Sequence, residues 1–169
     1  MLKKVLLNGT YGYENFISDK EKNLLVSWVN DNLHEFHSNR KGRYFRPLRE
    51  IENSPLELVE KLKANVIKLE GLVDWKDEPK MADYIGINYE GAYIHPHTDV
   101  NENNYIHTRY NIILSWPDEG GESIYGRSIN VLKENLVWKC IAGKFTHASK
   151  PVKGSKPRIT LSLGFLIKE

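Results

Sequence analysis

The stretch Arg158-Ile-Thr-Leu-Ser-Leu-Gly-Phe165, near the end of the chain, alternates polar and apolar side chains. Because successive side chains of a β-strand point to opposite faces, this alternation predicts a strand with one polar and one apolar face. The apolar face suits a position under helices. The polar face carries Arg158, Thr160 and Ser162, and an arginine that points into a protein interior requires an anionic partner.

Short β-branched and aromatic runs, separated by turn residues, continue the strand pattern back to Met81. We predict strands at 82–89, 92–97, 109–116, 122–126, 128–132, 135–141, 145–148 and 157–167. Many short strands after a helical region predict an α+β, mainly β fold. Its strands would form an antiparallel sandwich or barrel, with the helices packed on one outer face.

Two earlier segments, 18–36 and 54–71, carry apolar residues at helical spacing. Both segments begin with a Ser-x-x-Glu capping box: Ser18 to Glu21, and Ser54 to Glu57. The second helix is expected to end at Gly71. Each helix has one apolar face, which needs an apolar surface to cover, and a sheet can supply it.

The composition is that of one globular domain. A chain of 169 residues with 40% hydrophobic and 27% charged residues can bury a core without disulfides. We therefore expect a single domain over 1–169, with helical support over about 14–72 and a β-barrel over about 81–167.

Charge and cysteine content exclude several classes of protein. The net charge of +2 gives no reason to expect binding to nucleic acid or to membranes. The lone Cys140 cannot form an internal disulfide, and the apolar start at Val5 ends at Asn8-Gly9, too early for a signal sequence or a membrane span. We expect a cytoplasmic protein, monomeric or homodimeric.

The segment Tyr93-Ile-His-Pro-His-Thr-Asp99 carries the most informative polar pattern. In an extended chain, His97 and Asp99 share a face, so an imidazole and a carboxylate can reach one point. Two histidines and one carboxylate form the facial triad of non-haem Fe(II) oxygenases, which leaves open metal positions, and His147 can supply the third ligand. His95 shares the face of His97, so a ligand set that uses it stays open.

Further motifs follow in order: Arg109-Tyr-Asn-Ile-Ile-Leu-Ser-Trp116, Gly120-Gly121-Glu122, Thr146-His147, Pro151-Val152-x-Gly154 and Arg158-x-Thr160. In order and spacing, the set resembles the 2-oxoglutarate/Fe(II)-dependent dioxygenases, and most closely their prolyl 4-hydroxylase-like branch. The resemblance implies a double-stranded β-helix, a jelly-roll or cupin-like barrel.

By that resemblance, three catalytic residues bind Fe(II): His97, Asp99 and His147. The candidate residues for the 2-oxoglutarate cosubstrate are Arg158, Thr160, Tyr89 and Asn111. The implied reaction couples oxidative decarboxylation of 2-oxoglutarate, to succinate and CO2, with hydroxylation of a peptidyl or small-molecule substrate. The implied cofactors are Fe(II), 2-oxoglutarate and O2, with ascorbate as a further candidate. A carboxylate at Asp99, where Ala or Gly would vacate a metal position, favours hydroxylation over halogenation.

Three other functions compete with this interpretation. A nucleic-acid demethylase of the alkylation-repair type shares the triad but carries a second arginine six residues after the first, where this chain has Gly164. A non-catalytic, cupin-like metal-binding module predicts a broken triad or a missing arginine. A zinc hydrolase can use the same three ligands but gives no reason for Arg158.

The remaining candidates concern the substrate and the other polar residues. The densest basic run comprises Arg40, Lys41, Arg43, Arg46 and Arg49. It is either a solvated loop or, as the resemblance to the hydroxylase branch implies, a strand and loop over the mouth of the active site. It is the leading candidate for substrate contact, and the loop 101–107 is the second. The histidines expected at the surface or in caps are His34, His37 and His107. Cys140 is expected to be a small buried residue.

Overall fold

A computed structural model describes residues 1–40 and 42–168, apart from the side chain of Asn39. The elements of the first half are β1 (Lys3–Leu7), β2 (Thr10–Glu14), α1 (Asp19–Asp31), η1 (Leu33–Glu35), β3 (His37–Arg40), β4 (Arg43–Pro47), η2 (Leu48–Glu50), α2 (Leu56–Glu70) and β5 (Trp75–Asp77). Those of the second half are β6 (Tyr84–Asn88), β7 (Tyr105–Ser115), β8 (Glu119–Gly120), β9 (Ser123–Tyr125), β10 (Ser128–Asn130), β11 (Val137–Cys140), β12 (His147–Ser149), β13 (Val152–Lys153) and β14 (Arg158–Lys168).

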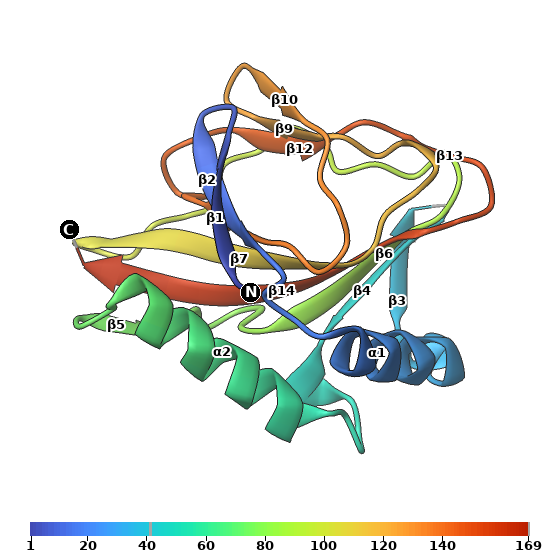
Figure 1. The fold of residues 1–169 in the computed structure, drawn as a ribbon, viewed down its shortest axis with the longest axis horizontal. Coiled ribbons are helices and arrows are strands. Elements are labelled where there is room, and N and C mark those ends of the chain that lie inside the picture. The colour runs from blue at the N-terminus through green and yellow to red at the C-terminus, as the bar shows by residue number, and fades with distance from the viewer. Residues whose placement is uncertain (41, 169) are drawn as a thin grey trace.

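Two facing antiparallel sheets form the barrel. Within the described residues, the larger sheet has nine strands in the order β1-β2-β11-β7-β14-β6-β4-β3, with β5 paired to β14. The smaller layer consists of the sheet β10-β9-β12 and the pair β13-β8. Figure 1 shows β9, β10 and β12 on one side of the larger sheet and both α-helices on its other side. The architecture is a double-stranded β-helix with N-terminal helices on the outer face of one sheet, as predicted.

Strand β14 has one face in the apolar core and the other in the interior of the barrel. One face of β14 contributes Ile159, Leu161, Leu163 and Phe165 to the main apolar core. The helices cover this face with Leu25 and Val29 of α1 and Val59, Leu62 and Val66 of α2. The opposite face of β14 turns its polar residues into the barrel. The predicted two-faced strand is therefore confirmed.

The first capping box is confirmed, and the second is wrong. The Ser18 hydroxyl accepts from the Glu21 amide at 3.3 Å, and the Glu21 carboxylate accepts from the Ser18 amide at 3.1 Å. At α2, Pro55 occupies the N-cap position, and a backbone hydrogen bond from the Leu56 amide to the Ser54 carbonyl turns the chain there. The Ser54 hydroxyl consequently lies one residue too early to cap the helix and has no hydrogen-bond partner.

Helix α2 ends as predicted, and neither helix is a membrane span. Gly71 adopts the left-handed conformation, with φ of 62°, which glycine tolerates without steric cost. Among the described residues, no helix combines the length and the apolar character needed to cross a bilayer.

The strand predicted at 92–97 is wrong. This segment joins no ladder; it forms an isolated bridge between His97 and His147, and the Ala92 and Ile94 carbonyls accept single backbone hydrogen bonds. The hairpin β1–β2 was not predicted, although Asn8-Gly9 is a strong hairpin signal and Gly9 has φ of +82°. The residue pattern did not predict β3, β4 and β5 either, although the resemblance implied a strand between the two helices. The β3–β4 hairpin is the basic run itself, which extends the large sheet beside β6.

Candidate functional site

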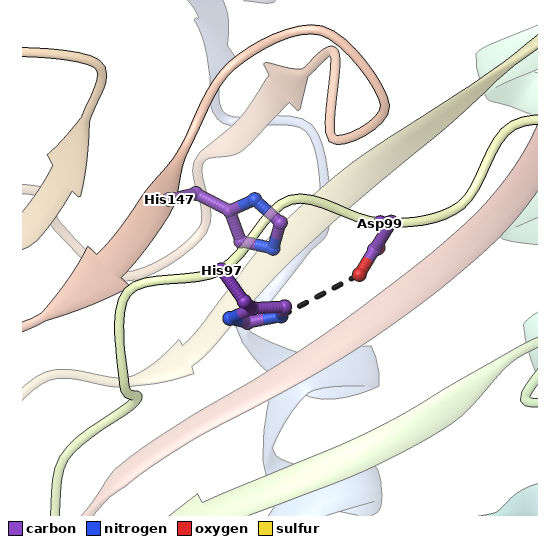
Figure 2. A group of neighbouring side chains, drawn as sticks. All are labelled: His97, Asp99 and His147. Carbon is purple, nitrogen blue, oxygen red and sulfur yellow. Dashed lines mark ion pairs between the residues drawn. The ribbon is translucent and has the colours of Figure 1, made fainter.

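The three predicted metal ligands lie together at one end of the barrel. The ligand atoms of His97, Asp99 and His147 all lie within 4.8 Å of one another, and Figure 2 shows their side chains converging. The distance between His97 Nε2 and Asp99 Oδ1 is 3.4 Å. Ligand atoms that each lie about 2.1 Å from one ion are roughly 3–4 Å apart, so small side-chain movements suffice to bind a metal.

Backbone pairing brings the two histidines together across 50 residues of sequence. The His97 amide donates to the His147 carbonyl at 3.2 Å, and the His147 amide donates to the His97 carbonyl at 2.9 Å. The imidazole centroids are 4.2 Å apart. A further hydrogen bond, from the Asp99 amide to the Ala142 carbonyl at 2.9 Å, fixes the carboxylate beside them.

Backbone carbonyls orient both imidazole rings. His97 Nδ1 lies 2.7 Å from the His95 carbonyl, and His147 Nδ1 lies 3.3 Å from the Phe145 carbonyl. Donation from Nδ1 leaves Nε2 of each ring as the free electron pair that a metal needs. Burial, followed by the nearby His97, lowers the pKa of His147 and favours the neutral, metal-binding form. The ring of His95 packs instead against Tyr93, with centroids 4.5 Å apart, so the ligand set that uses His95 is not formed.

The second oxygen of Asp99 is held by a buried cationic residue and a buried imidazole. Asp99 Oδ2 lies 3.4 Å from Arg109 Nε and 3.5 Å from His107 Nε2. Burial acts to raise the pKa of Asp99, but the hydrogen bond from His97 and the charges of His107 and Arg109 outweigh it and lower the pKa. Asp99 is therefore ionised, with Oδ1 directed to the site shared with the histidines.

Arg109 is itself fully paired. Its guanidinium donates to the Glu78 carboxylate at 3.0 Å and to the Ala82 carbonyl at 3.1 Å, and it lies over the Tyr84 ring at 4.9 Å. The sequence analysis did not identify Arg109 and Glu78 as neighbours of the site. It also predicted His107 at the surface, which is wrong, because His107 is buried and only 5% exposed. The alternation of side chains along a β-strand could have identified His107 and Arg109. Residues 107, 109 and 111 share one face of β7, and Asn111 was predicted to point inward from that face.

The triad and the predicted cosubstrate arginine line one cavity of about 210 Å³ between the two sheets. Arg158 is 5% exposed; it donates to the Ser123 hydroxyl at 3.0 Å and lies over the Trp116 ring at 5.5 Å. Burial lowers the pKa of Arg158 to about 10. Among the described residues, no carboxylate pairs with it.

Several buried polar atoms of β14 find no partner among the residues that the structure describes. These atoms are Arg158 Nε and the hydroxyls of Thr160 and Ser162, and all three residues line the cavity. Leaving such groups unpaired in a protein interior costs about 1–3 kcal/mol each. A guanidinium and two hydroxyls on one strand can donate hydrogen bonds to a carboxylate. This part of β14 therefore fits the distal carboxylate of 2-oxoglutarate.

The structure separates the two weaker cosubstrate candidates. Asn111 lines the cavity, opposite Ser162 in the β7–β14 register. Tyr89 does not: its ring packs edge-on against Tyr44, with centroids 5.9 Å apart, on the core side of the sheet. Strand period on β6 places Tyr84 on the cavity face instead.

Only part of the basic run approaches the cavity. Arg43 lines it, whereas Arg46 pairs with Glu35 at 2.9 Å and Arg49 donates to two backbone carbonyls at the surface. Arg40 is exposed. Lys41 lies outside the described residues. In the loop 101–107, the Asn101 side chain joins the His107 amide to the Gly143 carbonyl.

Cys140 is buried, as predicted, and lines the cavity below Arg109. Burial raises the pKa of its thiol, so Cys140 stays protonated. A protonated thiol is a poor metal ligand, which leaves the His and Asp side chains as the metal-binding groups.

By sequence comparison, no protein-family model matches the chain. No curated protein matches it either. The fold, in contrast, matches solved structures. The viral collagen prolyl hydroxylase vCPH of Paramecium bursaria Chlorella virus-1, solved with 2-oxoglutarate, superposes with a TM-score of 0.66 at 16% identity, over 97% of this chain and 94% of that one. This is the fold of 2-oxoglutarate-dependent oxygenases.

Two further structures give the same result. A Trichoplax adhaerens prolyl hydroxylase, in complex with a hypoxia-inducible-factor peptide, matches with a TM-score of 0.71 at 13% identity, over 95% of this chain and 84% of that one. The α-ketoglutarate-dependent epimerase SnoN of nogalamycin biosynthesis matches with a TM-score of 0.75 at 11% identity, over 94% and 78%.

Proposed function

We propose that the protein is an Fe(II)- and 2-oxoglutarate-dependent dioxygenase. It would couple the oxidative decarboxylation of 2-oxoglutarate, to succinate and CO2, with hydroxylation of a peptidyl or small-molecule substrate. The observation that carries this proposal is one cavity with a His-Asp-His cluster at one end and, at the other, a buried arginine that pairs with no carboxylate of the described residues. Structural relatives solved with 2-oxoglutarate support it.

The metal cluster and the polar groups of β14 then each have a function. His97 Nε2, Asp99 Oδ1 and His147 Nε2 would hold Fe(II), which, when bound, supplies the oxygen activation that side chains alone cannot perform. Arg158 would bind the distal carboxylate of 2-oxoglutarate through its planar fork of donors. The hydroxyls of Thr160 and Ser162 would donate to the same carboxylate.

Neighbouring residues orient these groups and exclude water. Arg109 donates to Asp99 Oδ2, and His107 Nε2 lies 3.5 Å from the same oxygen, so Oδ1 keeps its direction toward the two imidazoles. The apolar atoms of Trp138 and Ala148 line the same cavity and reduce the water around the reacting groups.

The alternatives fit the site less well. A second arginine of the alkylation-repair type has no room at Gly164, because a Cβ there would lie 2.6 Å from the Ala82 carbonyl and 2.9 Å from Arg109 Nη1. A zinc hydrolase leaves the buried Arg158 without a function. A non-catalytic cupin-like module gives no reason to keep both the triad and the arginine.

Anaerobic spectroscopy tests the proposal. Adding Fe(II) and 2-oxoglutarate to the wild-type protein should produce a weak visible charge-transfer band. The band should be lost in Asp99→Ala and weakened in Arg158→Ala, and it should persist in the control Asp31→Ala, which changes an exposed aspartate at the end of α1. A folded wild-type protein without any band would refute the proposal. Succinate release in air, screened against peptide and amino-acid pools, then identifies the substrate.

A further inference from the structure

The basic run is divided by the alternation of β4. Arg43 and Phe45 lie on the cavity face of this strand. The intervening Tyr44 packs into the core on the other face, and Arg46 forms its ion pair with Glu35 there. Of the run's described arginines, Arg43 is therefore the one that reaches the interior of the barrel.

Arg43 lies in one row with Arg158. In the register of the large sheet, Arg43 of β4 is opposite Asn88 of β6, and Asn88 is opposite Arg158 of β14. Neighbouring strands are about 4.8 Å apart, so the two arginines start about 10 Å apart on the same wall. The next row holds Phe45, Gly86 and Thr160. Gly86 has no side chain, and the Tyr84 ring lies beside it, since a Cβ on Gly86 would be 3.5 Å from Tyr84 Cε2.

Arg43 has no polar partner in the described part of the chain. Its guanidinium lies 5.4 Å from the Phe45 ring and forms no hydrogen bond or ion pair with any group that the structure describes, which leaves out Lys41, Glu169 and the Asn39 side chain. Arg109, on the same cavity, contrasts with it through the ion pair to Glu78. Burial lowers the pKa of Arg43, and the charge of Arg40 adds to this effect. A half-buried cation of this kind is costly until an anion reaches it.

If the proposed function is right, the site with metal and 2-oxoglutarate bound leaves the positive charge of Arg43 without a counter-charge. A divalent metal ion and the 2-oxoglutarate dianion would cancel each other. In net charge, Glu78 offsets Arg109 and Asp99 offsets Arg158, although Asp99 contacts Arg109 and not Arg158. Within the described residues that line the cavity, Arg43 is left as one uncompensated positive charge.

We propose that Arg43 is a specificity-determining residue that binds a carboxylate of the substrate. The substrate of this oxygenase then carries an acidic group, as a small carboxylic acid or as an acidic side chain of a peptide. A carboxylate suits the site because the guanidinium fork can donate to both of its oxygens, and one negative charge completes the balance. Arg158 is buried, whereas Arg43 is only partly buried, so Arg43 lies nearer to the surface of the protein.

Isothermal titration of small probes tests this assignment. The full chain, loaded with Fe(II) and saturating 2-oxoglutarate without oxygen, is titrated with propionate and with its neutral analogue propionamide. The wild type should bind propionate and not propionamide. Arg43→Gln should weaken propionate binding at least about tenfold, the loss expected for hydrogen bonds to a charged group. Arg43→Lys, which keeps the charge without the fork, should give an intermediate affinity.

Arg40→Gln is the matched control, because it removes an exposed arginine of the same hairpin. Its propionate affinity should stay within about twofold of the wild type, since rim charges contribute little to affinity. The assignment is overturned if the wild type does not bind propionate, or if Arg43→Gln binds it as well as the wild type does. It is also overturned if Arg43→Gln weakens 2-oxoglutarate binding as strongly as Arg158→Gln does, because Arg43 would then belong to the cosubstrate site.

The same titrations separate this inference from the proposed function. A wild-type protein with Fe(II) that does not bind 2-oxoglutarate refutes the proposed function, and the inference falls with it. Normal 2-oxoglutarate binding, together with propionate binding that is indifferent to Arg43, refutes the inference alone. Thermal unfolding of each variant confirms that the compared proteins are folded.

Discussion

The two ends of the cavity differ in how their charges are satisfied. At the metal end, Asp99 is already surrounded by Arg109, His107 and His97, and the His97 side chain is 44% exposed. At the other end, Arg158 is buried and keeps an unpaired Nε. At the metal end, the protein itself supplies the partners of Asp99, and the site is open to solvent. At the arginine end, Arg158 is closed off from solvent and lacks a hydrogen-bond acceptor for Nε among the described residues. This difference is what a site for an ion at one end and a carboxylate at the other requires.

The largest expected effect is on stability at the metal end. Arg109→Met leaves the buried Glu78 carboxylate without its cation, and breaking a buried ion pair in this way costs about 3–5 kcal/mol of unfolding free energy. Urea unfolding of the metal-free protein measures it. Replacing both partners, in Arg109→Met with Glu78→Leu, should recover little of the loss, because the Glu78 carboxylate also accepts from the backbone amides of residues 80–82. A single variant as stable as the wild type would show that this ion pair does not support the site.

The next effect is on metal affinity. His147→Ala removes one of three ligands, so Fe(II) affinity should fall by more than about 100-fold, beyond the range found for residues that only orient a ligand. Anaerobic titration with Fe(II) measures the change. His34→Ala, at a histidine whose side chain is 73% exposed, is the matched control and should bind Fe(II) normally. Equal affinities in the two variants would exclude His147 from the metal site.

The arginine end should respond in the opposite way to the metal end. Arg158→Met replaces an incompletely paired cation with an apolar side chain, so the stability of the unliganded protein should change by less than about 1 kcal/mol or increase. The variant should lose the added stability of about 2.7 kcal/mol that 2-oxoglutarate gives the metal-loaded wild type at 100 times its dissociation constant. Thermal unfolding with and without 2-oxoglutarate measures both quantities. If 2-oxoglutarate stabilised the variant normally, another residue would have to bind its distal carboxylate.

The smallest effect distinguishes two tyrosines of one strand and its turn. Tyr84 lines the cavity, and Tyr89 packs in the core beside Tyr44. Tyr84→Phe should weaken 2-oxoglutarate binding by about 2- to 10-fold, the value of one hydrogen bond. Tyr89→Phe should change it by less than about twofold. The reverse order would restore Tyr89 as the cosubstrate residue.

Local patterns predicted much of the fold because they depend on neighbouring residues. The capping box at Ser18, the left-handed stop at Gly71 and the two faces of β14 all follow from side chains a few positions apart. The capping box at Ser54 fails because a proline turn moves the helix start by one residue. The edge hairpins were missed because polar and basic residues interrupt their apolar alternation, and pairing with distant strands stabilises them instead.

The sequence could predict those parts of the site in which the residues lie close together along the chain. The proximity of His97 and Asp99 follows from the extended chain, but their meeting with His147 depends on a pairing between distant segments that only the resemblance supplied. The choice between Tyr84 and Tyr89 depends on where β6 ends, and strand ends are poorly determined by sequence. Arg43 could be placed in the cavity only once the register of β4 was known.

The reciprocal amide bridge between His97 and His147 has a thermodynamic consequence. Because the folded backbone already holds the two rings side by side, metal capture does not have to supply the loop-closure entropy of joining two distant segments. The measured affinity for the metal ion is then almost as high as the intrinsic affinity of the two imidazoles for it. A chain with this bridge can lose and regain its ion repeatedly without refolding.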